Sequence, residues 1–261
     1  MSYIGSTRGA TGRTALALLC LLPGLQADAA PVPLGEAFGF AVLSSSAITN
    51  SGASVVYGHI GVSPAGTMTG FSGATQIGGA MHWNTAVAVQ AQTDLAAAYN
   101  TVAGETATQN LTGQDLGART LAPGVYRFDT SAQLTGSLVL DAQNDPDPRF
   151  FFQMGSTLTT ASAATVTLTN GAAPSNVFWQ VGSSATIGTN TVFQGNILAM
   201  TSITLMNGAT NLNGRALARN GGGTLDANRI GVVIPECSTA LLAGGALPLV
   251  MLALLRRRRG V

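Results

Sequence analysis

Short runs in which apolar and polar residues alternate dominate the chain, and turn residues interrupt them every few positions. In the first third, such runs are Phe38–Leu43, Ser54–Tyr57, His59–Val62 and Thr67–Thr69, separated by glycine, asparagine or proline. An alternating run of this kind predicts a half-buried β-strand, and glycine or asparagine supplies the positive φ that a sharp corner needs. The pattern therefore predicts a mainly β protein built from many short strands.

One segment changes to a helical period. Its apolar residues recur at spacings of four, four, three and four positions, which places them on one face of a helix. These residues are Val87, Ala91, Leu95, Ala98 and Val102. We expect one helix over about residues 84–103, which lies alongside the strands and buries this apolar stripe.

The C-terminal half repeats one short phrase. Phe151–Thr159 (FFQMGSTLT) is echoed by Phe178–Thr186 (FWQVGSSAT), and looser copies end at Thr204 and Thr224. The threonines that align are Thr159, Thr186, Thr204 and Thr224, at steps of 27, 18 and 20 residues. A period near 20 residues that is rich in Thr, Ser, Gly and apolar β-formers is typical of a β-solenoid.

A second short polar segment follows each of these threonines, and residues 46–49 have a similar form. Stacked strands about 4.8 Å apart would bring such side chains into a ladder, and threonine suits a ladder because its χ1 is stiff. We therefore predict a flat binding face formed by Ser46, Thr49, Thr160, Ser162, Thr189, Thr191, Asn207, Thr210 and Asp226. The alternative is that these threonines are only good strand residues with no binding role.

The first residues have the pattern of a secretory signal peptide. Arg8 and Arg13 precede an apolar run from Ala15 to Leu25, and Ala27-Asp28-Ala29 follows as a small-residue cleavage site. The apolar run is too short to cross a bilayer. We expect residues 1–29 to direct export and to be removed.

The last residues combine a short motif, an apolar stretch and a basic end. The motif is Pro235, Glu236 and Cys237, and the basic end is Arg256, Arg257, Arg258 and Arg259. The 18 residues from Ser238 to Leu255 can just span a bilayer, with the arginines on the inner side. Residues 235–261 resemble the PEP-CTERM sorting signal of Gram-negative bacteria, with cysteine in place of its second proline. The resemblance implies passage through the inner membrane and delivery to the cell surface or matrix by the sorting machinery; a plain membrane anchor is the alternative.

Composition limits the chemistry of the segment between these ends, residues 30–234. It has six arginines, no lysine and nine acids, so its net charge is about −3 (6 − 9), and no basic stripe for nucleic acid is visible. Both cysteines lie in the end segments, which excludes a disulfide or thiolate metal site within it. His59 and His82 are isolated in the sequence, and Arg215 is expected to be solvated or to cap a turn. Residues 150–234 contain a single acid, Asp226, which disfavours a paired-carboxylate hydrolase. We expect no enzyme, cofactor or resident metal.

Six separated motifs carry a family resemblance across residues 33–232. They are Phe40–Leu43 (FAVL), Gly61–Pro64 (GVSP), Asp94–Tyr99 (DLAAAY), Leu121–Tyr126 (LAPGVY), Asn176–Gly182 (NVFWQVG) and Asn213–Ala218 (NGRALA). In this order they closely resemble the microbial ice-binding (antifreeze) proteins of the discontinuous β-solenoid type. The resemblance implies a three-sided β-solenoid with one long α-helix packed alongside. It also implies that the N-terminal coils stack against the C-terminal ones.

The same resemblance implies a flat ice-binding face with a loose Thr-Ala/Gly-X-Thr/Asn pattern. Asn207–Thr210 fits this pattern with one change, whereas Thr160–Ala163 lacks the final hydroxyl and Asp226–Arg229 ends in a charge. We therefore expect a secreted, monomeric domain whose partner is the ice crystal surface and which inhibits ice growth or recrystallisation. The alternative is a structural or adhesive surface protein of the same fold without ice activity.

Overall fold

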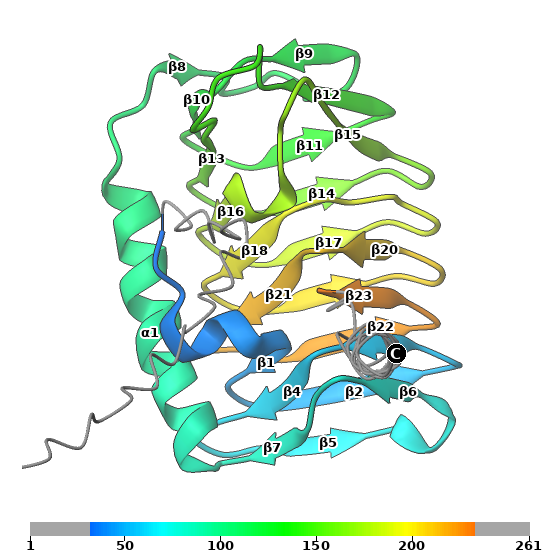
Figure 1. The fold of residues 1–261 in the computed structure, drawn as a ribbon. Coiled ribbons are helices and arrows are strands. Elements are labelled where there is room, and N and C mark those ends of the chain that lie inside the picture. Colours follow the sequence, from blue (N-terminus) through cyan, green and yellow to red (C-terminus); the bar gives the residue numbers. More distant parts are fainter. Residues whose placement is uncertain (1–31, 233–261) are drawn as a thin grey trace, which may run out of the picture.

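The computed structural model describes residues 32–232, so the predicted signal peptide and sorting signal lie outside the described residues. The described part is mainly β, with one long α-helix, α1 (Ala86–Gly104), along one side of a stack of short strands (Figure 1). Every pairing between its strands is parallel. Within residues 32–232, no helix is both long and apolar enough to cross a membrane.

The largest sheet, sheet A, has nine strands in the order β7-β4-β1-β21-β18-β16-β13-β10-β8. They are β1 (Phe40–Ser44), β4 (His59–Val62), β7 (Met81–Trp83), β8 (Gln109–Asn110), β10 (Gly124–Phe128), β13 (Phe150–Met154), β16 (Val177–Val181), β18 (Asn196–Ala199) and β21 (Arg215–Ala218). Most of the central strands are buried on both faces, because one face packs on the interior and the other is covered by α1.

Sheet B has seven strands in the order β11-β14-β17-β19-β22-β2-β5. They are β2 (Ala47–Ser51), β5 (Thr67–Thr69), β11 (Ala132–Leu134), β14 (Leu158–Thr160), β17 (Ala185–Ile187), β19 (Ile203–Leu205) and β22 (Gly223–Asp226). Its strands alternate between buried and more exposed residues, so one side of sheet B packs inside and the other meets solvent.

Two smaller sheets, here called the C sheets, complete the stack. One contains β9 (Arg119–Leu121), β12 (Ser137–Asp141) and β15 (Thr165–Thr169); the other contains β3 (Val55–Tyr57), β6 (Thr75–Ile77), β20 (Thr210–Leu212) and β23 (Arg229–Gly231). Val192 joins them through isolated bridges to Thr165 and Thr210. The chain visits sheet A, sheet B and a C sheet in turn, as in β13, β14 and β15. Short 3-10 helices occur at Gly35–Gly39 (η1), Phe71–Gly73 (η2) and Pro174–Asn176 (η3).

Chain order is broken in the middle of the stack. Val42 of β1 pairs with Ala216 of β21, and Val56 of β3 pairs with Ile230 of β23. In Figure 1 the blue N-terminal strands accordingly lie beside the orange C-terminal ones. The N-terminal coils therefore stack on the C-terminal coils, as the family resemblance implied.

Helix α1 covers the outer face of sheet A. Its buried residues are Ala88, Ala91, Leu95, Ala98, Tyr99 and Val102, and their cluster includes Phe151, Phe178, Leu198 and Leu217 of the sheet. Val87 was predicted in this stripe, but its side chain is 38% exposed and Ala88 is buried instead. The reason is that positions 88, 91, 95, 98 and 102 follow the 3.6-residue helical period more closely. The predicted strand at Phe38 also begins later, at Phe40, because Gly35–Gly39 forms η1.

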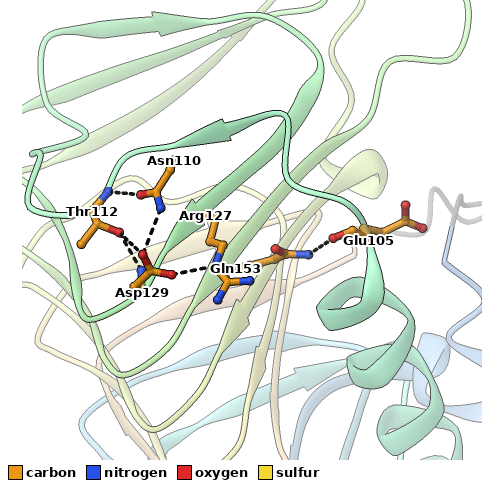
Figure 2. A network of polar contacts seen from close by, with 6 residues as sticks. All are labelled: Glu105, Asn110, Thr112, Arg127, Asp129 and Gln153. Atoms are coloured by element: carbon orange, nitrogen blue, oxygen red, sulfur yellow. Dashed lines mark hydrogen bonds and ion pairs between the residues drawn. The ribbon is translucent and has the colours of Figure 1, made fainter.

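The glutamine that recurs in the repeated phrase, at Gln153 and Gln180, anchors this helix. Gln153 and Gln180 pair side by side on β13 and β16. Gln153 Nε2 donates to the carbonyl oxygens of Val102 (2.7 Å) and Glu105 (2.8 Å), and Figure 2 shows the second of these bonds. Gln180 Nε2 donates to the Tyr99 hydroxyl at 2.6 Å. Because the last carbonyls of a helix lack partners within it, the glutamine of the phrase completes the end of α1.

A polar network secures the coil at the β8 edge of sheet A. Asp129 accepts hydrogen bonds from Arg127 Nε (2.7 Å), Asn110 Nδ2 (3.0 Å) and the Thr112 hydroxyl (3.2 Å), as Figure 2 shows. The bond from Arg127 is the main cause of a pKa of Asp129 below its usual value. The polar groups of this network therefore find their partners within the coil. The network also places charged side chains next to the edge strand β8, where charge discourages pairing with a further strand.

Candidate functional site

The threonines that align in the sequence repeat stand in register on the outer side of sheet B. Thr159 pairs with Thr186, Thr186 with Thr204, and Thr204 with Thr224. The row continues through the N-terminal strands, because Thr224 pairs with Thr49 and Thr49 with Thr69. We call these six residues the threonine ladder. Its N-terminal members were not visible in the repeat, since they join it only through the broken chain order.

The ladder extends across six neighbouring strands. Six residues on neighbouring parallel strands span five strand spacings, or about 24 Å at roughly 4.8 Å each. All six side chains are exposed or half-buried. The hydroxyls of Thr49 and Thr224 lie 3.5 Å apart, which joins the N-terminal and C-terminal coils across the surface as well as in the backbone.

A second row of small side chains runs beside the ladder. These residues lie two positions before each ladder residue and therefore face the same side of the sheet. They are Thr157, Ser184, Ser202, Gly222, Ala47 and Thr67. The backbone N–H groups of Ser202 and Gly222, in the next coils, donate to Ser184 Oγ (3.3 Å) and Ser202 Oγ (3.2 Å) respectively, which fixes these serines. No side chain in either row is larger than threonine or charged, so the two rows form a flat, uncharged strip. Asp226, two positions after Thr224 in β22, lies on the same side of the sheet beside this strip.

Two predicted face residues do not reach the surface. Thr160 is 3% exposed and Thr191 is fully buried, and their hydroxyls lie 3.1 Å apart. Thr160 Oγ1 also accepts a hydrogen bond from the Gly188 N–H, and the Thr191 hydroxyl donates to the Ala161 carbonyl. The prediction is wrong for these two residues. Successive side chains of β14 alternate, so Thr159 and not Thr160 points outward. Thr191 lies outside the strands of sheet B, and its hydroxyl contacts Thr160 and Ala161 instead of solvent.

The remaining predicted face residues are distributed over several parts of the surface. Thr49 lies in the ladder, and Ser46 is exposed at the corner before β2. Ser162, Thr189 and Asn207 lie in turns after the strands of sheet B. Asp226 ends β22, and Thr210 belongs to β20 in a C sheet. The structure therefore does not bring these residues together into one face.

The outer side of the C sheets is less regular than that of sheet B. Thr210 pairs with Arg229, whose Nη2 donates to the Tyr57 hydroxyl at 3.3 Å. Val192, which joins the two sheets, is exposed. A long charged side chain and an aromatic ring thus interrupt the surface next to Thr210, so it lacks the flatness of the threonine ladder.

The two histidines meet although they are isolated in the sequence. His82 Nε2 lies 3.1 Å from His59 Nδ1, and His82 Nδ1 lies 3.0 Å from the hydroxyl of Thr85, which caps the N-terminus of α1. Burial, together with the neighbouring charge of His59, lowers the pKa of His82. Among residues 32–232 no cluster of three or more His, Cys, Asp or Glu side chains could hold a metal ion.

A family model described as ice-binding-like matches residues 42–231, which include both the threonine ladder and the strands that support it. The chain belongs to the ice-binding protein family. An ice-binding protein of Nostoc sp. (strain HG1) is 48% identical over 239 residues, which cover 87% of this chain and 88% of that protein.

Solved structures agree with this family assignment. An ice-binding protein from an Antarctic biological consortium superimposes with a TM-score of 0.74 at 41% identity, covering 77% of this chain and 91% of that one. An ice-binding protein from the Antarctic ascomycete Antarctomyces psychrotrophicus gives a TM-score of 0.74 at 36% identity, covering 78% of this chain and 99% of the other.

Proposed function

We propose that the domain is a three-sided β-solenoid that binds ice through the outer side of sheet B. The observation that carries this proposal is the register of the threonine ladder, six threonines in line over about 24 Å beside a second row of small side chains. The names of the related proteins support ice as the partner and a non-enzymatic role.

The chemistry of the ladder suits an ordered layer of water. Each threonine offers a hydroxyl that holds a water molecule and a methyl group that excludes others, and both sit at the fixed spacing of the strands. Stiff χ1 angles and a sheet packed from below mean that little side-chain entropy is lost on contact with a crystal. Adsorption of this surface would stop growth of the ice front where the protein lies.

The decisive experiment replaces single threonines by tyrosine in the purified domain, residues 30–234. Thr186→Tyr and Thr204→Tyr place a ring in the middle of the ladder, while Thr210→Tyr places the same ring on a C sheet as a matched control. We expect the two ladder variants to lose most of the thermal hysteresis and crystal faceting, and the control to retain both. Loss only in Thr210→Tyr would move the site to the C sheets. A folded wild-type domain without hysteresis would refute ice binding and favour the adhesive role.

We also propose that residues 1–29 direct export and that residues 235–261 direct sorting to the surface of a Gram-negative bacterium, so that the domain acts outside the cell. The sequence patterns at the two ends support this location. Intact-mass measurement of the protein recovered from cells and medium would test it. A mature mass that begins at Ala30 and ends near Cys237 is expected, and an unprocessed chain in the cytoplasm would contradict the proposal.

A further inference from the structure

Arg215 is buried, and no counter-ion for it lies among residues 32–232. It lies at the start of β21 and was expected to be solvated or to cap a turn, yet it is only 2% exposed. In the part of the chain that the structure describes, the ion pairs are Arg127–Asp129 and Arg149–Asp147, so no carboxylate there lies within 4 Å of Arg215. Burial lowers the pKa of the guanidinium to about 10, because the charged form loses hydration.

Neutral groups hold the guanidinium in place. Its Nε donates to the Phe38 carbonyl and its Nη1 donates to Asn196 Oδ1, both at 2.8 Å. The Phe38 ring covers it, with 4.2 Å between the ring centre and the guanidinium carbon. These contacts fix the orientation of Arg215 without neutralising its charge. A guanidinium has five N–H donors, and these bonds use only two of them.

A small pocket opens beside this charge. Its volume is about 110 Å³, and it is lined by Phe38, Gly39, Phe40, Ala41, Tyr57, Gly58, Arg215 and Val232. Arg215 is the only charged group among these residues, and the remaining lining is mostly hydrocarbon. The volume is equivalent to about three or four water molecules of liquid. The pocket thus offers one fixed cation at an apolar wall.

We propose that Arg215 and this pocket bind a carboxylate group carried on a short alkyl body. A carboxylate matches the planar guanidinium and would supply the missing negative charge, while the alkyl part would contact the hydrocarbon walls. Phosphate fits less well, because it is strongly hydrated and the pocket has no second cation. The inference does not depend on ice binding.

The carboxylate has two possible sources with the same chemistry. One is a free small acid, for which propionate is a suitable probe. The other is the chain's own Glu236, which is the only acid after Asp226 and follows the pocket residue Val232 by four positions in the sequence. The variant Glu236→Gln separates these sources, since it removes one negative charge and leaves the pocket residues intact.

The test measures thermal unfolding of the full chain in a neutral detergent while propionate is added at constant ionic strength. Propionamide, which has nearly the same shape without the charge, is the matched control. Ligand that binds only the folded state raises the unfolding midpoint in a saturable manner. If free acid is the source, propionate stabilises both the wild type and Glu236→Gln. If Glu236 is the source, Glu236→Gln melts below the wild type, and propionate restores only the variant.

A pocket variant tests the position of the site. Phe38 is 54% exposed, so Phe38→Ala should fold, but it removes the ring that covers the guanidinium. Both this change and its control, Trp83→Ala, an exposed aromatic residue outside the pocket lining, are made in the Glu236→Gln background, where the pocket is open to propionate whichever source is correct. We expect Phe38→Ala to raise the propionate concentration at half-effect at least fivefold and Trp83→Ala to leave it unchanged. The proposal is overturned if propionate acts no better than propionamide on both the wild type and Glu236→Gln, or if Phe38→Ala leaves the response of Glu236→Gln to propionate unchanged.

Discussion

The glutamine that anchors α1 allows a quantitative test of the fold. Gln153 is buried, and its amide group supplies two hydrogen bonds, at 2.7 and 2.8 Å, to the carbonyl oxygens of Val102 and Glu105. Gln153→Leu keeps a side chain of similar size but cannot donate. Each lost bond costs about 0.5–1.5 kcal/mol, so we expect the free energy of unfolding to fall by about 2 kcal/mol.

Thermal unfolding followed by circular dichroism would measure this loss in the domain of residues 30–234. For a domain of this size, 1 kcal/mol corresponds to about 2–4 °C, so the midpoint should fall by roughly 4–8 °C. Gln133→Leu is a matched control, because Gln133 is exposed on sheet B and a surface change costs within about 0.5 kcal/mol. A midpoint for Gln153→Leu within 1 °C of the control would refute the anchoring role.

A second readout separates stability from function. Gln153 lies on sheet A beneath the helix, whereas the threonine ladder lies on sheet B. We therefore expect Gln153→Leu to retain full thermal hysteresis near 0 °C, far below its unfolding midpoint. Loss of hysteresis in a sample that is still folded would show that α1 controls the shape of the proposed ice-binding surface.

Two further predictions concern adjacent threonines and the histidine pair. Thr160→Val should lower the free energy of unfolding by about 1–3 kcal/mol, because the buried Gly188 N–H loses its acceptor, and should leave hysteresis intact. Thr159→Val should leave the free energy of unfolding nearly unchanged and reduce hysteresis. Urea unfolding and hysteresis measurements on both variants test this pair, and loss of hysteresis in Thr160→Val but not in Thr159→Val would contradict it. The lowered pKa of His82 means that the unfolded state binds a proton more readily than the folded state, so stability should be complete above about pH 6.5 and decline as the pH falls below it. His82→Gln should flatten this decline in urea unfolding measured from pH 7.5 to 5, and an unchanged pH profile would contradict the assignment.

The hydrophobic pattern predicted the elements of this fold well where packing repeats a local rule. The strands at His59–Val62 and Thr67–Thr69 have the predicted bounds, and α1 was expected within two residues of its observed start. The phrase shared by Phe151–Thr159 and Phe178–Thr186 predicted which residues would pair, and the structure pairs them in that register. Alternation within a strand and the repeat between successive coils are both properties of the local sequence, which is why they could be predicted from it.

Contacts between distant segments could not be read in this way. His59 and His82 are 23 positions apart and meet only because successive coils stack, and Phe38 reaches Arg215 only because the N-terminal coil inserts beside β21. Neither contact produces a periodic pattern in the sequence from which it could be predicted. Of the two roles expected for Arg215, solvation is wrong for the same reason, since its burial depends on a segment 177 residues away.

The sequence by itself determined the many short strands, the single helix and the row Thr159, Thr186, Thr204 and Thr224. Only the tertiary structure decided that Thr49 and Thr69 extend this row, because a solenoid stacks coils by backbone hydrogen bonds and need not keep chain order. It also decided which of two successive threonines faces solvent. A strand with the sequence Leu-Thr-Thr satisfies its hydrogen bonds with either side inward, and only the packing of Leu158 against the interior turned Thr159 out and Thr160 in.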